Sequence, residues 1–206
     1  MTEIVADTRL RRGADLIVAV TALIALLPLF AGIALAIRLT SRGPVVYRQC
    51  RVGRDERPFV IWKFRTMVAN AEDIGPVVSG SEDPRITRVG RWLRATRLDE
   101  LPQLVNLLRG DMTLIGPRPE VERFICYYSP AERELLTVRP GVLGPGALLF
   151  AAAQSQELTV AADPEAHYVA YHLHPKLALD LAYLARRGIR ADLALLTRTA
   201  RVVLKR

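Results

Sequence analysis

The chain contains 206 residues, a length typical of one domain with a sizeable core. Half of its residues are hydrophobic and 24% are charged, a mix that argues against a polytopic membrane protein and favours a soluble body with one membrane segment. The net charge of +8 indicates anionic partners such as lipid headgroups, nucleotide phosphates or nucleic acid, and two cysteines are too few for a disulfide framework.

The first notable segment, residues 16–37, has no charged side chain and lies between Asp15 and Arg38. As one straight helix it would be about 33 Å long, enough to cross a hydrocarbon core of about 30 Å. Basic residues precede it, as they do in a secretory signal peptide, but the apolar core of a signal peptide is much shorter. We therefore expect the segment to remain in the protein as a membrane helix.

Arginines flank this segment on both sides, with Arg11 and Arg12 before it and Arg38 and Arg42 after it. Because flanks rich in Lys and Arg stay on the cytoplasmic side, a straight span would have to export one cluster. A re-entrant helix that turns near Pro28 keeps both clusters on one side, since proline breaks a helix. On physical grounds alone a kinked span is favoured, because re-entrant backbone in a membrane needs its polar groups satisfied.

After the membrane segment, residues 44–52 and 58–67 read as two extended segments around a turn at residues 53–56. Lys63 and Arg65 alternate with apolar side chains and would share one face of the second strand. That face is either a solvated basic surface or a surface that binds phosphate.

Residues 70–90 are rich in Gly, Pro, Ser and Asp and are predicted to form a loop over the site. Residues 91–98 then place Arg91, Arg94 and Arg97 at helical spacing, which aligns the three arginines on one face. Such a stripe commonly faces solvent or lipid headgroups.

Two adjacent carboxylates, Asp99 and Glu100, precede Pro102 and the helical pattern QLVNLL. Proline is tolerated where a helix begins, so Asp99 would lie near the helix N-terminus, where free amides and the dipole hold a carboxylate ionised. An ionised aspartate among arginines can attack a phosphorus centre covalently. The alternative is a helix cap beside a solvated charge.

Further along, residues 116–119 hold Arg118 between two prolines, a rigid way to present a guanidinium that can bind phosphate through two hydrogen bonds. A plain tight turn is the alternative.

The C-terminal part carries less chemical signal. His167, His172 and His174 lack a neighbouring cysteine or acidic ligand in the run HYVAYHLH, so we interpret them as part of a packed surface helix rather than a metal site. Residues 176–206 combine leucines at helical spacing with basic side chains. This pattern fits either basic helices on an anionic membrane surface or helices that pack on the core.

Residues 97–119, RLDELPQLVNLLRGDMTLIGPRP, closely resemble the signature of the bacterial polyprenyl-phosphate phosphoglycosyl transferases, the small monotopic sugar transferases. The same family is matched by WKFRTM at residues 62–67, by DPRITRVG at residues 83–90, and by the basic pair that precedes Asp15. The resemblance covers residues 9–150 well and the C-terminal part more loosely.

The resemblance implies a membrane entry through a broken, re-entrant helix and so favours that form over the kinked span. Leu27 precedes Pro28 here, where family members carry a serine before the proline. Arg12 and Asp15 match the family's entry motif and are expected to support the re-entrant turn together with Pro28.

The resemblance also implies a reaction, the transfer of a sugar 1-phosphate from a UDP-sugar to polyprenyl (undecaprenyl) phosphate with release of UMP. Asp99 would attack the β-phosphate to give an aspartyl phosphosugar, and Asp99 and Glu100 would hold Mg²⁺. The substrate's phosphates would be bound by four cationic side chains, Lys63, Arg65, Arg94 and Arg118.

We therefore predict an α/β, helix-rich fold in one domain, residues 1–206. It would consist of the re-entrant helix (16–37), a cytoplasmic catalytic core with a short antiparallel β-hairpin (38–150), and C-terminal surface amphipathic helices (151–206). The expected location is the cytoplasmic face of the bacterial inner membrane, and the expected partners are a UDP-sugar, polyprenyl phosphate and membrane lipids, without nucleic acid. A membrane-anchored nucleic-acid-binding or scaffolding protein is the alternative, and the sequence leaves the sugar and the oligomeric state open.

Overall fold

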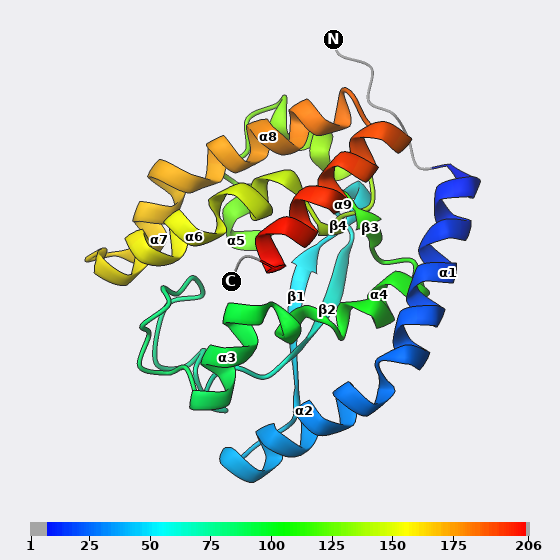
Figure 1. Cartoon of the computed structure of the whole chain (residues 1–206). Helices are drawn as coiled ribbons and strands as arrows, with labels where there is room; N and C mark the ends of the chain where they lie inside the picture. The colour runs from blue at the N-terminus through cyan, green and yellow to red at the C-terminus, as the bar shows by residue number, and fades with distance from the viewer. Residues whose placement is uncertain (1–7, 205–206) are drawn as a thin grey trace.

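The computed structural model describes residues 8–204, whose course is shown in Figure 1. The helices in chain order are α1 (Arg9–Ala25), α2 (Leu27–Thr40), α3 (Arg88–Thr96), α4 (Gln103–Arg109), α5 (Glu122–Ile125), α6 (Pro145–Val160), α7 (Pro164–His167), α8 (His174–Leu184) and α9 (Ile189–Leu204). The 3₁₀ helices are η1 (Arg54–Glu56), η2 (Leu98–Glu100) and η3 (Glu132–Thr137), and η4 (Tyr168–Leu173) is π-helical. The strands are β1 (Val46–Val52), β2 (Pro58–Phe64), β3 (Thr113–Ile115) and β4 (Gly141–Leu143).

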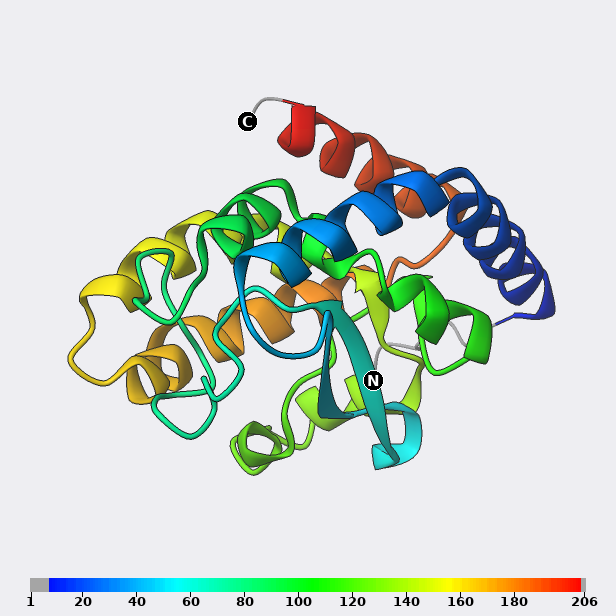
Figure 2. The ribbon, with the colours of Figure 1, turned by 90° about the horizontal axis from the view of Figure 1, so that it is seen from below.

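The N-terminal apolar segment forms two successive helices, α1 and α2 (Figure 2). The direction of the chain bends by 62° between them. The break lies at Leu26, and Pro28 occupies the first turn of α2, where its missing amide hydrogen has no helical partner to lose. The predicted break near Pro28 is confirmed. Among residues 8–204, no single helix is long and apolar enough to cross a membrane, whereas the bent pair meets that test by length and composition.

Asp15 and Arg12 are among the polar side chains that fasten α1 to the rest of the protein. Asp15 is buried and accepts hydrogen bonds from the Thr113 hydroxyl (2.8 Å) and the Leu114 amide (3.0 Å). Arg12 donates to the carbonyl oxygens of Leu107 and Leu108 at the end of α4. Asp15 and Arg12 therefore anchor the first half of α1 to α4 and β3, away from the break at Leu26. Their support of the turn near Pro28, which the family resemblance implies, stays a prediction.

The β1–β2 hairpin lies at the centre of the molecule (Figure 1), and its antiparallel register pairs Val46 with Phe64 and Val52 with Pro58. This confirms the predicted hairpin. Phe64 packs against Ile33 of α2 and Leu93 of α3, which joins the bent helix pair to the body on one side of the hairpin.

On the other side of the hairpin, a larger apolar core joins β1 to α5, η3, α6, α8 and α9. Leu177 and Leu184 of α8 are buried there, so α8 packs on the core, the second of the two readings of the C-terminal pattern. On α9, Leu195 is buried, while Leu193 remains exposed. The basic residues at positions 205 and 206 lie outside the described residues.

A second pairing, between β3 and β4, was not expected from the sequence. The two short strands run parallel, with Thr113 opposite Gly141 and Ile115 opposite Leu143. The backbones approach so closely that a Cβ atom at Gly141 would lie 2.1 Å from the amide nitrogen of Gly116. Glycine at position 141 is thus a packing requirement, and the close contact fixes the start of the loop that carries Arg118.

Candidate active site

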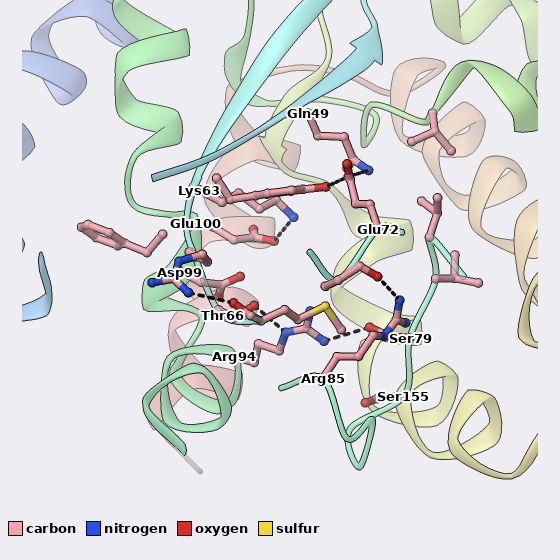
Figure 3. Close-up of a pocket in the computed structure, with 18 of the residues that line it drawn as sticks. Gln49, Lys63, Thr66, Glu72, Ser79, Arg85, Arg94, Asp99, Glu100 and Ser155 are labelled. Carbon is pink, nitrogen blue, oxygen red and sulfur yellow. Dashed lines mark hydrogen bonds and ion pairs between the residues drawn. The ribbon is translucent and has the colours of Figure 1, made fainter. Parts of the chain in front are cut away.

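The predicted catalytic and phosphate-binding residues line a cavity of about 1250 Å³, whereas Arg12, Asp15 and Pro28 are not part of its lining. It is bounded by the hairpin, the segment after β2, α3, the Arg118 loop and α6 (Figure 3). This volume exceeds that of a typical drug-sized pocket. Its mixed lining of charged and apolar side chains indicates a ligand with both phosphate and less polar parts.

The two carboxylates lie at a strained turn between α3 and α4. Arg97 adopts a left-handed backbone conformation (φ +58°), and Asp99 and Glu100 follow in η2. A non-glycine residue in this region costs on the order of 1 kcal/mol or more, and such strain concentrates at functional sites. Pro102 caps α4, so the predicted helix after the carboxylates is confirmed.

Glu100 is held by two cations. Arg118 donates from both terminal nitrogens to the two carboxylate oxygens of Glu100, and the Lys63 ammonium lies 3.7 Å from one of them. Burial favours the protonated form of Glu100, but Arg118 and Lys63 outweigh it and lower its pKa to about 2. Glu100 is therefore a firmly ionised, oriented carboxylate.

The pKa of Asp99 is shifted in the opposite direction from that of Glu100. Burial, together with the adjacent charge of Glu100, raises the pKa of Asp99 to about 6, against the lowering effects of Lys63 and Arg94. The sequence suggested that the helix N-terminus would favour ionisation. That expectation was wrong in direction, because desolvation and carboxylate repulsion dominate at this turn. Asp99 still remains mostly ionised at neutral pH and is the more basic of the two carboxylates.

Two further predicted cations lie in the same cavity. Lys63 points from β2 toward Glu100 (Figure 3), and burial lowers its pKa to about 8. Arg94 projects from α3 and donates to the hydroxyls of Thr66 and Ser79, each at 2.9 Å. The structure thus brings Lys63, Arg94 and Arg118 around the carboxylate pair.

Arg65 does not join this group. Its guanidinium donates to the backbone carbonyls of Ser41, Pro44 and Met67, and so ties the end of β2 to the segment that follows α2. The strand ends at Phe64, and the alternation that placed Arg65 on the same face as Lys63 ends with it. Arg65 also lines the cavity, so its role as a phosphate ligand stays a prediction, beside the structural role that these contacts show.

Asp180 of α8 was missed by sequence reasoning. It is buried and accepts hydrogen bonds from the backbone amides of Arg118 (3.2 Å) and Gly146 (2.9 Å), and so positions the Arg118 loop against the start of α6. Burial raises its pKa to about 6. A lone acid in the apolar run LALDLAYL was an available signal, since buried carboxylates require partners.

A second missed group lines the cavity wall. Tyr168 donates to Glu120, and Lys176 donates to the Tyr168 hydroxyl at 2.9 Å. Arg51 lies 3.8 Å from Glu120 on the hairpin side. Glu120 is therefore a buried carboxylate in a polar network at the cavity.

The loop between β2 and α3 covers part of the cavity, as expected. Arg85 fastens it, with hydrogen bonds to both oxygens of Asp83 and to the carbonyls of Ala71 (2.7 Å) and Pro76 (3.0 Å). Ser79, within this loop, reaches Arg94 (Figure 3). Hydrogen bonds therefore hold the loop together internally and also join it to Arg94 of the cavity wall.

A family model described as bacterial sugar transferase matches residues 6–206. The chain belongs to the bacterial sugar transferase family. This confirms the resemblance seen in the sequence, and the family match extends through the C-terminal helices.

Individual relatives give the comparison more detail. A UDP-N-acetylgalactosamine-undecaprenyl-phosphate N-acetylgalactosaminephosphotransferase from Aeromonas hydrophila is 44% identical over 66% of this chain and 33% of its own length. A UDP-glucose:undecaprenyl-phosphate glucose-1-phosphate transferase from Escherichia coli is 42% identical over 66% of this chain and 30% of its own length. A transferase of the same name from Caulobacter vibrioides is 39% identical over 92% of this chain and 67% of its own length. The chain spans about a third of the length of the first two relatives.

Proposed function

We propose that this protein transfers a sugar 1-phosphate from a UDP-sugar to undecaprenyl phosphate and releases UMP, the first membrane step of a polysaccharide or glycoconjugate pathway. The observation that carries the proposal is the adjacent pair Asp99 and Glu100, which faces a cavity lined by Lys63, Arg94 and Arg118. Phosphoryl transfer depends mainly on positioning and charge stabilisation, which this arrangement supplies. The names of the relatives support the same reaction.

Asp99 is the proposed nucleophile. One of its oxygens attacks the β-phosphorus of the UDP-sugar, the bond to the UMP oxygen breaks, and UMP leaves with that electron pair. An oxygen of the lipid phosphate then attacks the phosphorus of the aspartyl phosphosugar, which restores the Asp99 carboxylate. The raised pKa of Asp99 supports this role, because a more basic carboxylate oxygen is the better nucleophile once ionised.

The three cations have separate parts in this proposal. Arg118 and Lys63 orient Glu100 and lie where they can offset phosphate charge, and Arg94 approaches from the α3 side of the cavity. Together they reduce the repulsion between an anionic nucleophile and an anionic diphosphate.

The carboxylate pair fits Mg²⁺, whose preferred ligands are carboxylate and phosphate oxygens. Arg118 and Lys63 already balance Glu100, whereas the raised pKa of Asp99 marks it as the less balanced carboxylate, which a cation would stabilise. Bound Mg²⁺ would supply charge neutralisation at the diphosphate. Asp99 and Glu100 are the residues proposed to hold it.

We place the bent α1–α2 pair in the cytoplasmic leaflet as a re-entrant hairpin, with the body of the protein on the cytoplasmic side. The outward-facing side chains of the pair support this placement, since Ile17, Ile24, Leu35 and Leu39 are all more than half exposed. Such a placement would bring the cavity to the depth of the lipid phosphate, so that one soluble and one membrane substrate can meet.

Cysteine labelling tests the topology. The exposed Cys50 and Cys126 are first replaced by serine, and single cysteines are placed at Thr2, outside the described residues, or at Ser41. A membrane-impermeant maleimide should label neither position in intact spheroplasts and both after permeabilisation. If either position is labelled in intact spheroplasts, the cytoplasmic re-entrant placement fails; labelling at only one of them would indicate a spanning pair.

Turnover tests the activity. The purified protein is supplied with undecaprenyl phosphate and a panel of UDP-sugars, and UMP release is followed together with covalent labelling from a donor labelled in the β-phosphate. Asp99→Asn should abolish both signals, while Asp55→Asn, at an exposed aspartate of the hairpin turn, should leave both unchanged. A wild-type protein that releases no UMP with any sugar, yet binds DNA with steep salt dependence, would instead support the nucleic-acid alternative.

A further inference from the structure

The segment that joins α7 to α8 is π-helical, an arrangement that is rare and often found at functional positions. His167 and His172 are five residues apart across this segment. In an α-helix, residues five apart point about 140° away from each other. A π-helical turn closes on residue i+5 and therefore brings the two imidazoles to the same side of the helix.

A carboxylate from α6 meets the two imidazoles. Glu157 Oε2 lies 3.3 Å from His167 Nε2 and 3.1 Å from His172 Nε2, and ligand atoms of all three residues lie within 4.8 Å of one another. Two ligands bound to Zn²⁺ at about 2.0–2.1 Å in tetrahedral geometry are themselves about 3.3 Å apart. The Glu157–histidine spacings match that separation.

His172 is a buried side chain that needs a partner. It is 2% exposed, and within the described part of the chain neither of its ring nitrogens has a partner in hydrogen-bond geometry, although Nε2 approaches Glu157. A buried imidazole aimed at a carboxylate and a second imidazole has the character of a ligand.

We propose that Glu157, His167 and His172 form a transition-metal site that binds Zn²⁺, separate from the carboxylate pair of the active site. Two imidazoles and one carboxylate are a known protein ligand set for zinc, and the partial exposure of Glu157 and His167 leaves a fourth position for water. The sequence argued against metal here because the run HYVAYHLH lacks an acid. The acid comes from the preceding helix and becomes a neighbour only in the fold.

The proposed metal would join α6 to η4. Gln154 and Ser155 of α6 and Tyr168 of η4 line the active-site cavity, so the metal would hold two parts of that wall together. Its expected effect is therefore on stability, with free Zn²⁺ above its Kd raising the midpoint of thermal unfolding.

The site is tested on the full-length protein in detergent, after removal of any polyhistidine tag and of bound metal with a chelator. Zn²⁺ binding is measured by calorimetry, and Co²⁺ is used as an optical probe of a four-coordinate site with nitrogen ligands. We expect one equivalent of Zn²⁺ at micromolar affinity or better. His167→Ala and Glu157→Gln, at partly exposed positions, should each weaken binding at least about tenfold, because loss of even an outer-shell partner commonly weakens binding by 10–100-fold.

His174→Ala is the matched control, because His174 contacts Glu132 instead of this cluster (2.8 Å) and should retain wild-type affinity. Asp99→Asn should also retain it, since that change affects only the active-site carboxylates. The proposal is overturned if the wild type binds no Zn²⁺ at micromolar concentrations. It is equally overturned if His167→Ala and Glu157→Gln bind as the wild type does, or if His174→Ala loses affinity to the same extent.

Discussion

Replacing Arg118 by methionine tests the electrostatic core of the active site. The substitution keeps much of the apolar volume but removes the two hydrogen bonds that hold Glu100, whose side chain is only 18% exposed. Glu100 then retains only the Lys63 ammonium, at 3.7 Å, as a counter-charge. A buried carboxylate deprived of its main partner is strongly destabilising.

The expected loss follows from the pKa of Glu100, which the folded protein lowers from 4.5 to about 2. At about 1.4 kcal/mol per pKa unit, this corresponds to about 3 kcal/mol of stability at neutral pH. For a chain of this size, that loss lowers the midpoint of thermal unfolding by roughly 6–12 °C. Because the folded-state pKa is depressed, the contribution is fully present above pH 4.5 and disappears as the pH falls through 2.

The assay is a double-mutant cycle of Arg118→Met, Glu100→Gln and the double variant, followed by thermal unfolding in detergent at neutral pH. Glu100→Gln removes the charge that would be left unpaired, so the double variant should be clearly more stable than the sum of the single losses implies. The loss caused by Arg118→Met should also shrink between pH 5 and pH 3. Additive single losses, or an Arg118→Met protein that unfolds at the wild-type temperature, would refute this reasoning.

Four other outcomes are expected. The pKa of Asp99 is about 6 before metal binds, and bound Mg²⁺ should lower it because the cation favours the ionised carboxylate. The kcat/KM for UMP release should therefore fall at acidic pH, and the fall should move to lower pH as Mg²⁺ is raised; a profile that does not respond to Mg²⁺ would contradict this role. Chelation should stop UMP release, and Mg²⁺ alone should restore it; recovery that requires Zn²⁺ would be the contrary result. Asp180→Leu should raise the KM for the UDP-sugar and lower stability by about 1–3 kcal/mol, with Asp180→Asn less affected, because the Arg118 and Gly146 amides lose their acceptor. Asp15→Ala should lower the unfolding midpoint by several degrees without changing KM, since it loosens α1 from β3 rather than the cavity.

Local chemistry was sufficient for much of the architecture. The uncharged stretch and Pro28 predicted an interrupted apolar helix, and alternation around a turn predicted the hairpin. Pro102 marked the start of the helix that follows the carboxylates. These features depend on side chains close together in the sequence, so their periodicity carries the information. The tightly spaced motifs that pointed to the family are equally local.

Contacts between distant residues had to come from the folded structure. Arg118 meets Glu100 because β3 and β4 pair and Asp180 fixes the connecting loop, and the pKa of Asp99 rises because burial outweighs the helix terminus. Arg65 turns to backbone carbonyls at the end of its strand, which alternation alone could not foresee.

The histidines also show the difference between what the sequence indicates and what only the fold brings together. His167 and His172 were visible in the sequence, but α-helical spacing would have set them apart, and Glu157 lies on another helix. The order of residues along the chain thus determined which local elements form and which chemical groups are available. Burial and long-range packing decided which of those groups meet and which charges are balanced, because desolvation and Coulomb interactions depend on distances through space.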